Sequence, residues 1–269
     1  MTENLLHRVP FRIGTTSYIV PDDILPNVHY LAGRVRDIEL VLFELDDGPS
    51  NVPDSSLVAD LNHLAQPNDL SFTVHLPLDL RLGADGDEQH VSLHKACRVI
   101  EATRALQPWA YVVHLDGKEH RQQPYGRAYL DWVSQAVRSL EIVAGWAGGL
   151  ERLAVENLDQ YPLEFIEPVL ARVPVSRCVD IGHLWLDGHD PLPYLARALP
   201  TTRVIHIHGI AERDHKSLAH VPAAQLDPVL AFLVQQSYQG VLTLEIFSEE
   251  DLATSLAALA ASFNRITAR

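Results

Sequence analysis

The sequence contains few cysteines and no long apolar run. Cys97 and Cys178 are the only cysteines among 269 residues, too few for a disulfide framework, so a reducing compartment is expected. Nowhere do about 18 apolar residues follow one another, and the start of the chain lacks a basic segment followed by an apolar one. These absences predict a cytoplasmic protein with no membrane partner.

Positive charge is also scarce. The chain carries 21 Lys and Arg against 35 Asp and Glu, a formal net charge of −14 at pH 7. Such a surface repels polyanions, so nucleic acid is not expected as a partner. A small-molecule substrate fits this composition better.

Histidine, in contrast, is abundant. The sequence has 14 histidines, and several of them lie within or at the ends of segments rich in aliphatic and β-branched residues. In "RVIHIHGI", residues 203 to 210, His206 and His208 stand two positions apart, which places both imidazoles on one face of a strand. Two histidines on one face at the end of a strand indicate a site.

Eight strand-like segments recur along the chain, and their starts are 24 to 41 residues apart. This spacing leaves room for a loop and a helix after each strand, as a right-handed crossover between parallel strands requires. The segments are "FRIGTTSY" from 11, "DIELVLFE" from 37, "SFTVHLP" from 71, "YVVHLDG" from 111, "RLAVENL" from 152, "SRCVDIGHL" from 176, "RVIHIHGI" from 203 and "GVLTLEIF" from 240.

Helical periodicity fills the intervals, with apolar residues every three or four positions at 92–106, 128–147, 164–173, 223–236 and from 249 onward. The alternation predicts an α/β protein, a (β/α)8 TIM barrel formed by one domain over 1–269, with 1–10 as an N-terminal tail. An open doubly wound sheet is the alternative. Its dinucleotide fingerprint G-x-G-x-x-G is missing from the first turn, "GTTSYIVPDD" from 14.

Ionisable residues cluster at the ends of the predicted strands. In "FTVHL" the apolar side chains alternate with Thr73 and His75, so His75 points to the barrel interior, and the same test orients His114, Glu156, Asp180 and Glu245 inward. A single histidine or glutamate at a strand end is usually structural, but coincidence on six consecutive strands is improbable. The full set is Glu44, His75, His114, Glu156, Asp180, His183, His206, His208 and Glu245.

Carboxylates that converge in a barrel need compensation, because a buried unpaired carboxylate costs several kcal/mol or takes up a proton. A divalent cation supplies it, and carboxylates mixed with imidazoles suit Zn²⁺, Mn²⁺ or Fe²⁺. Glu44 is the weaker candidate, because Glu39 lies five residues away on the opposite face of the same segment. His208 is expected to contact substrate.

The segment "ERDHKSL", residues 212 to 218, follows the seventh strand and is expected to lie over the barrel mouth. Asp214 and His215 are candidate metal ligands there. Arg213 and Lys216 are candidates for binding a substrate phosphate. The alternative is a solvated charged loop.

At these residues the chain resembles the xylose isomerase-like barrel superfamily, which includes endonuclease IV-type enzymes and sugar epimerases. The matching pieces are "VHLP" at 74, "VHLDG" at 113, "VENL" at 155, "DIGH" at 180, "HIHG" at 206 and "LEIF" at 244. The resemblance implies a four-ligand metal centre of Glu156, Asp180, His206 and Glu245. It also implies a second metal held by His75 and His114, with Glu156 bridging, and a third metal or the substrate at His183.

The loop departs from the endonuclease IV-like pattern. That branch supplies an Asp-x-His pair after the seventh strand for its third metal, whereas Asp214 and His215 are adjacent here. Two divalent ions per chain are therefore expected.

The stretch from 14 to 44 and "ERDHKSL" are more narrowly similar to cobamide-remodelling phosphodiesterases. That resemblance implies hydrolysis of the phosphodiester in the nucleotide loop of a B12-type corrinoid, with Glu156, His183 and Glu245 as catalytic residues. Two alternatives remain open. One is a single-metal sugar isomerase or epimerase in which Glu156 and Glu245 move a proton, and the other is a non-catalytic corrinoid-binding or metal-binding protein. The sequence makes no prediction of oligomeric state.

Overall fold

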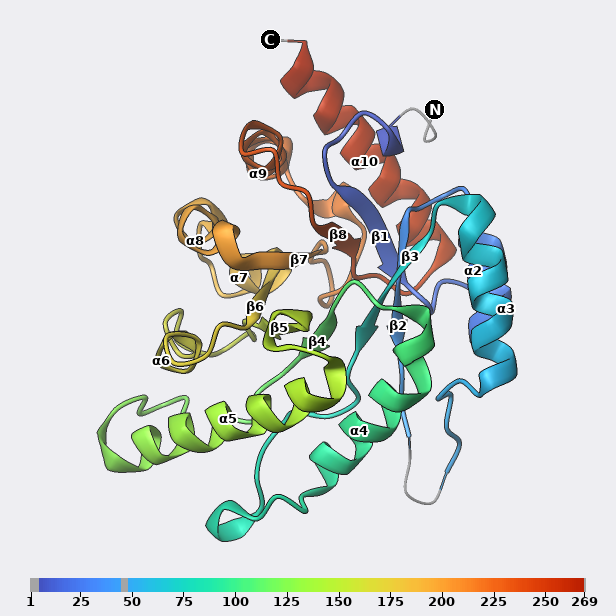
Figure 1. Ribbon diagram of the computed structural model, residues 1–269. Coiled ribbons are helices and arrows are strands. Elements are labelled where there is room, and N and C mark those ends of the chain that lie inside the picture. The colour runs from blue at the N-terminus through green and yellow to red at the C-terminus, as the bar shows by residue number, and fades with distance from the viewer. Residues whose placement is uncertain (1–4, 45–47, 269) are drawn as a thin grey trace.

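A computed structural model describes residues 5–44 and 48–268, and its centre is a closed barrel of parallel strands. Each strand pairs with its neighbour in sequence, and β1 pairs with β8 to close the ring (Figure 1). This confirms the predicted (β/α)8 barrel and excludes the open sheet. The strands are β1 Arg12–Thr16, β2 Asp37–Val41, β3 Ser71–His75, β4 Tyr111–Val113, β5 Leu153–Glu156, β6 Ser176–Asp180, β7 Thr202–Ile207 and β8 Val241–Leu244.

Helices surround the strands on the outside of the barrel (Figure 1). The periodic segments at 92–106, 128–147, 223–236 and from 249 form helices, as predicted. Ser248 begins the last of them by accepting a hydrogen bond from the backbone N–H of Asp251 at 3.1 Å. The helices are α2 Ile24–Leu31, α3 Ser55–Ala65, α4 Val91–Thr103, α5 Gly126–Ala147, α6 Glu167–Leu170, α7 Ile181–Leu186, α8 Pro191–Ala198, α9 Ala223–Gln235 and α10 Glu249–Thr267.

One predicted helix is much shorter in the structure. The pattern at 164–173 predicts ten helical residues, but α6 spans only Glu167–Leu170. Pro168 explains the start, because a proline ring clashes with the carbonyl four residues before it and is tolerated only in the first turn of a helix. Residues 157–166 are thus left as a loop beside the end of β5.

Two apolar clusters hold the barrel. The larger one lies between strands and helices, and the smaller one lies inside the barrel. On each of β4 to β7, a small apolar residue stands two positions before the ionisable residue at the C-terminal end of the strand. Residues two apart in a strand lie on the same face, so the two side chains both face the barrel axis. The inner apolar residues are Ala110, Val112, Ala154, Cys178 and Val204.

The start of the described chain is packed rather than loose. Leu5, Leu6 and Val9, within the segment expected to be a tail, are buried in the outer core, and Leu5 and Val9 lie beside Phe263 of α10. Residues 1–4 of that segment fall outside the described part. Within the described residues, no helix is long and apolar enough to cross a membrane.

Candidate metal centre

Four side chains from β5, β6, β7 and the end of β8 meet at the C-terminal mouth of the barrel. His206 Nδ1 lies 3.3 Å from Glu245 Oε2, 3.5 Å from Glu156 Oε2 and 4.0 Å from Asp180 Oδ2. We call Glu156, Asp180, His206 and Glu245 the four-ligand group, because each offers an atom within 4.8 Å of the others. The structure thus brings together the ligands that the resemblance implied.

A second group shares Glu156. His114 Nε2 lies 3.2 Å and His75 Nε2 3.6 Å from the same oxygen of Glu156, Oε2. The two imidazoles come from the ends of β3 and β4, and their rings meet edge to face with centroids 4.8 Å apart. We call His75, His114 and Glu156 the paired-histidine group.

A third group contains three histidines. The rings of His208 and His215 stack with centroids 4.4 Å apart, and His183 lies edge-on to both. His215 reaches this position because the 212–218 loop turns back over β7, where Gly209 and Lys216 pair through their backbones. His208 therefore lies where it could hold a metal, whereas the sequence predicted a substrate contact.

The acids and imidazoles shift one another's protonation. Burial alone would raise the pKa of the Glu156 carboxyl, but His206 and His114 outweigh burial and hold that pKa well below its usual value. Burial opposes a charge on His114, yet Glu156 and Asp79 raise the pKa of that imidazole to about 10. Burial likewise opposes a charge on His215, but Glu245 and Asp214 raise the pKa of His215 to about 9. Without a metal, protons on the histidines balance the carboxylates.

Several buried polar atoms of the site have no hydrogen-bond partner within the described residues. Buried polar atoms without a partner are rare, and each one calls for an explanation such as a bound ion or water. The set of nitrogen and carboxylate atoms fits Zn²⁺, Mn²⁺ or Fe²⁺. These atoms are Asp180 Oδ2, His206 Nδ1, His208 Nε2 and Glu245 Oε2.

Glu39 was missed as a site residue. Its Oε2 lies 2.9 Å from His206 Nε2, both side chains are fully buried, and Nδ1 of the imidazole is left facing the acids of the four-ligand group. Glu44, predicted as a weak ligand, is instead ion-paired with Arg98 at 2.6 Å. The physical reason is that β2 ends at Val41, so the chain has left the barrel before it reaches residue 44.

Two further residues support the ligands. Asp79 lies 3.1 Å from Nδ1 of His114, so the other ring nitrogen faces Glu156. The side chain of Asn157 binds the backbone N–H and C=O of Asp180 at 2.9 and 3.0 Å, which ties β5 to β6. Sequence alternation could not reveal either role, because both residues lie beyond the ends of strands.

The predictions for the residues of the 212–218 loop have different outcomes. His215 joins the three-histidine group, and Asp214 Oδ1 lies 3.2 Å from His215 Nδ1, where it orients that ring. Arg213 is exposed and Lys216 half-buried on this loop. Their binding of a substrate phosphate stays a prediction.

Below the metal centre the barrel interior is polar on the β2 and β3 side. Asp37 is fully buried and accepts a hydrogen bond from the Ser71 hydroxyl. Burial raises the pKa of Asp37 to about 7; the hydrogen bond from Ser71 opposes this rise, and the nearby Glu39 adds to it. Gly14 makes room for this side chain, because a Cβ there would lie 3.0 Å from Cβ of Asp37.

Comparison with solved structures gives the same architecture. A D-tagatose 3-epimerase-like protein superposes with a TM-score of 0.74 at 17% identity, over 96% of this chain and 98% of that one. Endonuclease IV from Thermus thermophilus superposes with a TM-score of 0.70 at 19% identity, over 94% and 99%. A 3-keto-D-glucoside 4-epimerase from E. coli gives 0.67 at 17% identity, over 94% and 99%. At these identities the likeness concerns the fold.

The sequence itself was compared with curated proteins and with family models. No curated protein matches the chain. The family model described as xylose isomerase-like TIM barrel matches residues 34–265, which include every residue of the three groups. The chain therefore belongs to the xylose isomerase-like TIM barrel family.

Proposed function

We propose that the protein is a metal-dependent phosphodiesterase. The observation that carries the proposal is the position of Glu156 Oε2, which lies 3.2 Å from His114 Nε2 and 3.5 Å from His206 Nδ1. One carboxylate thus joins two groups that could each hold an ion. Paired ions that share a ligand suit phosphoryl transfer, because together they contact the attacking and the leaving oxygens.

The site residues would divide the work as follows. His75 and His114 with Glu156 would hold one ion, and the four-ligand group would hold the other. When bound, divalent ions supply Lewis-acid activation of a water molecule and of the phosphoryl group. His183 Nδ1 is hydrogen-bonded to the carbonyl of Asn157 at 3.0 Å, so the other ring nitrogen, Nε2, would stabilise charge on the substrate from the side of the three-histidine group.

The proposed substrate is the nucleotide-loop phosphodiester of a cobamide. Support for it comes from the similarity of residues 14–44 and 212–218 to cobamide-remodelling phosphodiesterases. The first stretch forms β1, α2 and β2 and carries Glu39, and the second carries His215. The net charge of −14 disfavours a nucleic-acid duplex as the substrate.

A sugar isomerase or epimerase is the second candidate. It is favoured by the superposition on epimerase structures and by the presence of Glu156 and Glu245, two carboxylates suited to moving a proton, in one group. Such a reaction needs only the four-ligand group. His75 and His114 therefore distinguish the two functions.

Mass spectrometry of adenosylcobalamin incubated with the metal-loaded protein tests the proposal. We expect a cobinamide phosphate and a nucleoside fragment, and we expect His75→Ala and His114→Ala each to abolish their formation while the protein stays folded. Glu44→Gln is the matched control and should keep full turnover, because Glu44 pairs with Arg98 outside the site.

Three outcomes would contradict the proposal. Near-normal turnover in both histidine variants would refute the paired-ion mechanism. An intact cobamide together with epimerised sugar and one ion per chain would establish the second candidate. An intact cobamide that copurifies with the protein would indicate a non-catalytic corrinoid-binding protein.

A further inference from the structure

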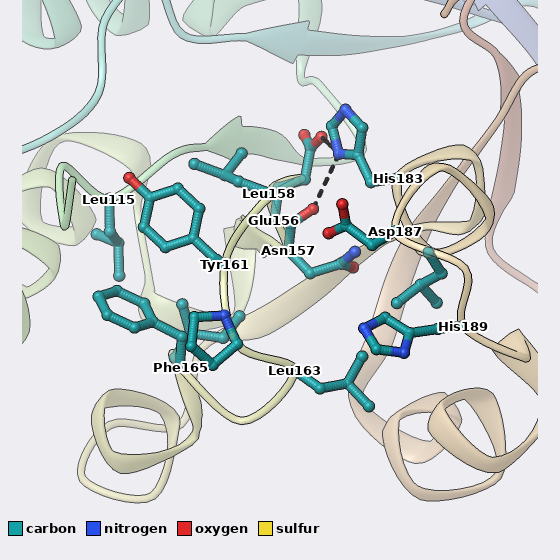
Figure 2. Close-up of a pocket in the computed structure, with 13 residues that line it drawn as sticks. Leu115, Glu156, Asn157, Leu158, Tyr161, Leu163, Phe165, His183, Asp187 and His189 are labelled. Atoms are coloured by element: carbon teal, nitrogen blue, oxygen red, sulfur yellow. Dashed lines mark hydrogen bonds and ion pairs between the residues drawn. The ribbon is translucent and has the colours of Figure 1, made fainter. Parts of the chain in front are cut away.

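The pocket beside the metal centre is nearly filled by its own side chains. It lies between the loop after β5 and α7, where Figure 2 shows Phe165 and Leu158 close to Glu156 and His183. The free volume there is only about 20 Å³, which holds about one or two water molecules. A small organic ligand needs a larger pocket than this one.

Such a pocket lies at the opposite end of the barrel, where the strands begin. Its volume is about 510 Å³, within the range of about 300–1,000 Å³ that is usual for small-molecule sites. It is formed at the starts of β6, β7 and β8 by residues that follow α8 and α9. Its lining includes Trp109, Leu199, Arg203, Phe232, Gln236 and Gln239.

The charge of this pocket is opposite to that of the whole chain. Among the described residues that line it, Arg203 is the only charged one, whereas the chain carries a net charge of −14. Burial and the nearby Arg152 outweigh Glu151 and lower the pKa of the Arg203 guanidinium. The neighbouring residues thus compensate this positive charge only in part, which favours binding of an anion from solution.

Trp109 holds the side chain of Arg203 in place. The guanidinium carbon lies 4.0 Å from the centroid of the Trp109 ring, and Arg203 Nε donates a hydrogen bond to the Trp109 carbonyl at 2.5 Å. Trp109 Nε1 in turn donates to the Arg203 carbonyl at 2.9 Å. Nη1 and Nη2 of Arg203 donate to no residue in the described part of the chain. An ordered planar fork of donors is therefore left for a ligand, and little side-chain entropy is lost on binding.

The other walls of the pocket suit the body of a small organic molecule. Leu199 and Phe232 supply apolar surface on one side of it. Gln236 and Gln239 are exposed and supply amide groups that can donate hydrogen bonds at the opening. A cationic fork beside apolar surface favours an anion with an apolar body over a bare inorganic ion.

We propose that this pocket binds a small organic oxyanion. Its carboxylate or phosphate group would meet Arg203, and its apolar body would lie against Leu199 and Phe232. The fork of an arginine matches both groups, because each presents two oxygens that accept parallel hydrogen bonds. The site lies at the other end of the barrel from the metal centre, so the inference goes beyond the proposed function and does not depend on it.

Phenylphosphonate and benzoate are suitable probes, because they carry the two candidate groups on the same ring. Benzamide is the neutral counterpart of benzoate. Titration into the protein loaded with Zn²⁺, which is diamagnetic, is followed by the NMR signal of the Trp109 indole N–H, so that binding at the metal centre is not mistaken for binding here. We expect a saturable shift with at least one anion and none with benzamide. The tighter anion identifies the natural group as a phosphate or a carboxylate.

Two variants test the role of charge in the pocket. Arg203→Gln should weaken binding of the anion at least tenfold, because two charge-assisted hydrogen bonds are lost. Gln239→Glu adds a negative charge at the opening with almost no change of shape, so it should also weaken binding, and it replaces Arg203→Gln if that variant fails to fold. Arg172→Gln is the matched control, because Arg172 is exposed, donates to Ser134 and does not line the pocket.

Three results would overturn the assignment. The first is equal affinity for the anion in wild type, Arg203→Gln and Gln239→Glu. The second is benzamide binding as tight as that of benzoate, or a Trp109 signal that neither anion shifts to saturation. The third is inorganic phosphate binding as tightly as phenylphosphonate, which would refute an organic ligand. Hydrolysis is not measured in these experiments, so their outcome is independent of the phosphodiesterase proposal.

Discussion

Glu39 and His206 form a fully buried pair in which the carboxylate oxygen Oε2 lies 2.9 Å from the imidazole Nε2. The two residues are 167 positions apart in the chain, on β2 and β7. The contact fixes the orientation of the ring, so that Nδ1 faces Glu156 and Glu245. A carboxylate that is hydrogen-bonded to one ring nitrogen of a metal-binding histidine also makes the other ring nitrogen a better ligand.

Glu39→Gln should weaken metal binding by the four-ligand group by about 10–100-fold, the usual effect of losing such a partner. Competition with a coloured chelator measures the affinity, and loading with Co²⁺ reports the coordination of this group through its absorption spectrum. Glu39→Asp, which keeps the charge, should recover part of the affinity. Unchanged affinity in Glu39→Gln would show that His206 needs no partner, and Glu44→Gln serves as the control because Glu44 lies outside the site.

Gly182→Ala should displace His208 from the three-histidine group, because a Cβ at residue 182 would lie 2.2 Å from His208 Nε2. If this group holds an ion, Gly182→Ala and His208→Ala should lose that same ion, as counted by elemental analysis of the purified proteins. Gly145→Ala is the control. Residue 145 faces open space on α5, so its alanine should stabilise the helix by about 0.5–1 kcal/mol and leave the metal count unchanged.

Asp37 should make the protein less stable as pH rises from about 4 to about 7. The pKa of this carboxyl is about 7 in the folded chain against 3.8 as the reference value, so the folded state holds a proton that the unfolded state has lost in this window. The free energy of unfolding therefore falls with pH, by at most about 1.4 kcal/mol per unit, and the loss is complete above pH 7. Asp37→Asn should remove this slope in urea unfolding.

Asp69 should affect the pH dependence of stability in the opposite direction to Asp37, and Asp69→Asn tests this effect. Burial raises the pKa of Asp69, but Arg36 and Arg12 together outweigh burial and lower this pKa below the reference value. The contribution of Asp69 to the free energy of unfolding is therefore present above its pKa in the unfolded chain. It is lost as pH falls through its pKa in the folded chain. A slope in Asp37→Asn equal to that of the wild type would contradict the assignment of the proton to Asp37.

Metal affinity of the paired-histidine group should rise with pH. The pKa of His114 is about 10 without metal, so between pH 6 and 9 an ion must displace a proton from this imidazole. The affinity should increase about tenfold per pH unit, as measured by chelator competition, and His114→Ala should flatten the dependence. Asp79→Asn should shift it toward lower pH, because Asp79 helps to hold the charge on His114. An affinity that does not vary with pH would rule out His114 as a ligand.

Much of the site could be predicted from the sequence, because strand alternation and barrel geometry act on neighbouring residues. Once Val113 and Val155 face the helices, His114 and Glu156 must face the axis. The prediction that Glu44 is a metal ligand was wrong, because the alternation of side chains does not show where β2 ends. The length of α6 was predicted wrongly because the apolar period at 164–173 is helical, while Pro168 is tolerated only in the first turn and the helix begins at Glu167.

The sequence by itself determined the barrel, the strand that carries each ligand and the face on which each ligand lies. These follow from periodicity, which is a property of the local backbone. Only the tertiary structure decided that Glu39 supports His206 and that His208 stands with His183 and His215. Such contacts depend on how strands and loops far apart in the chain close around one axis, and no local pattern encodes that closure.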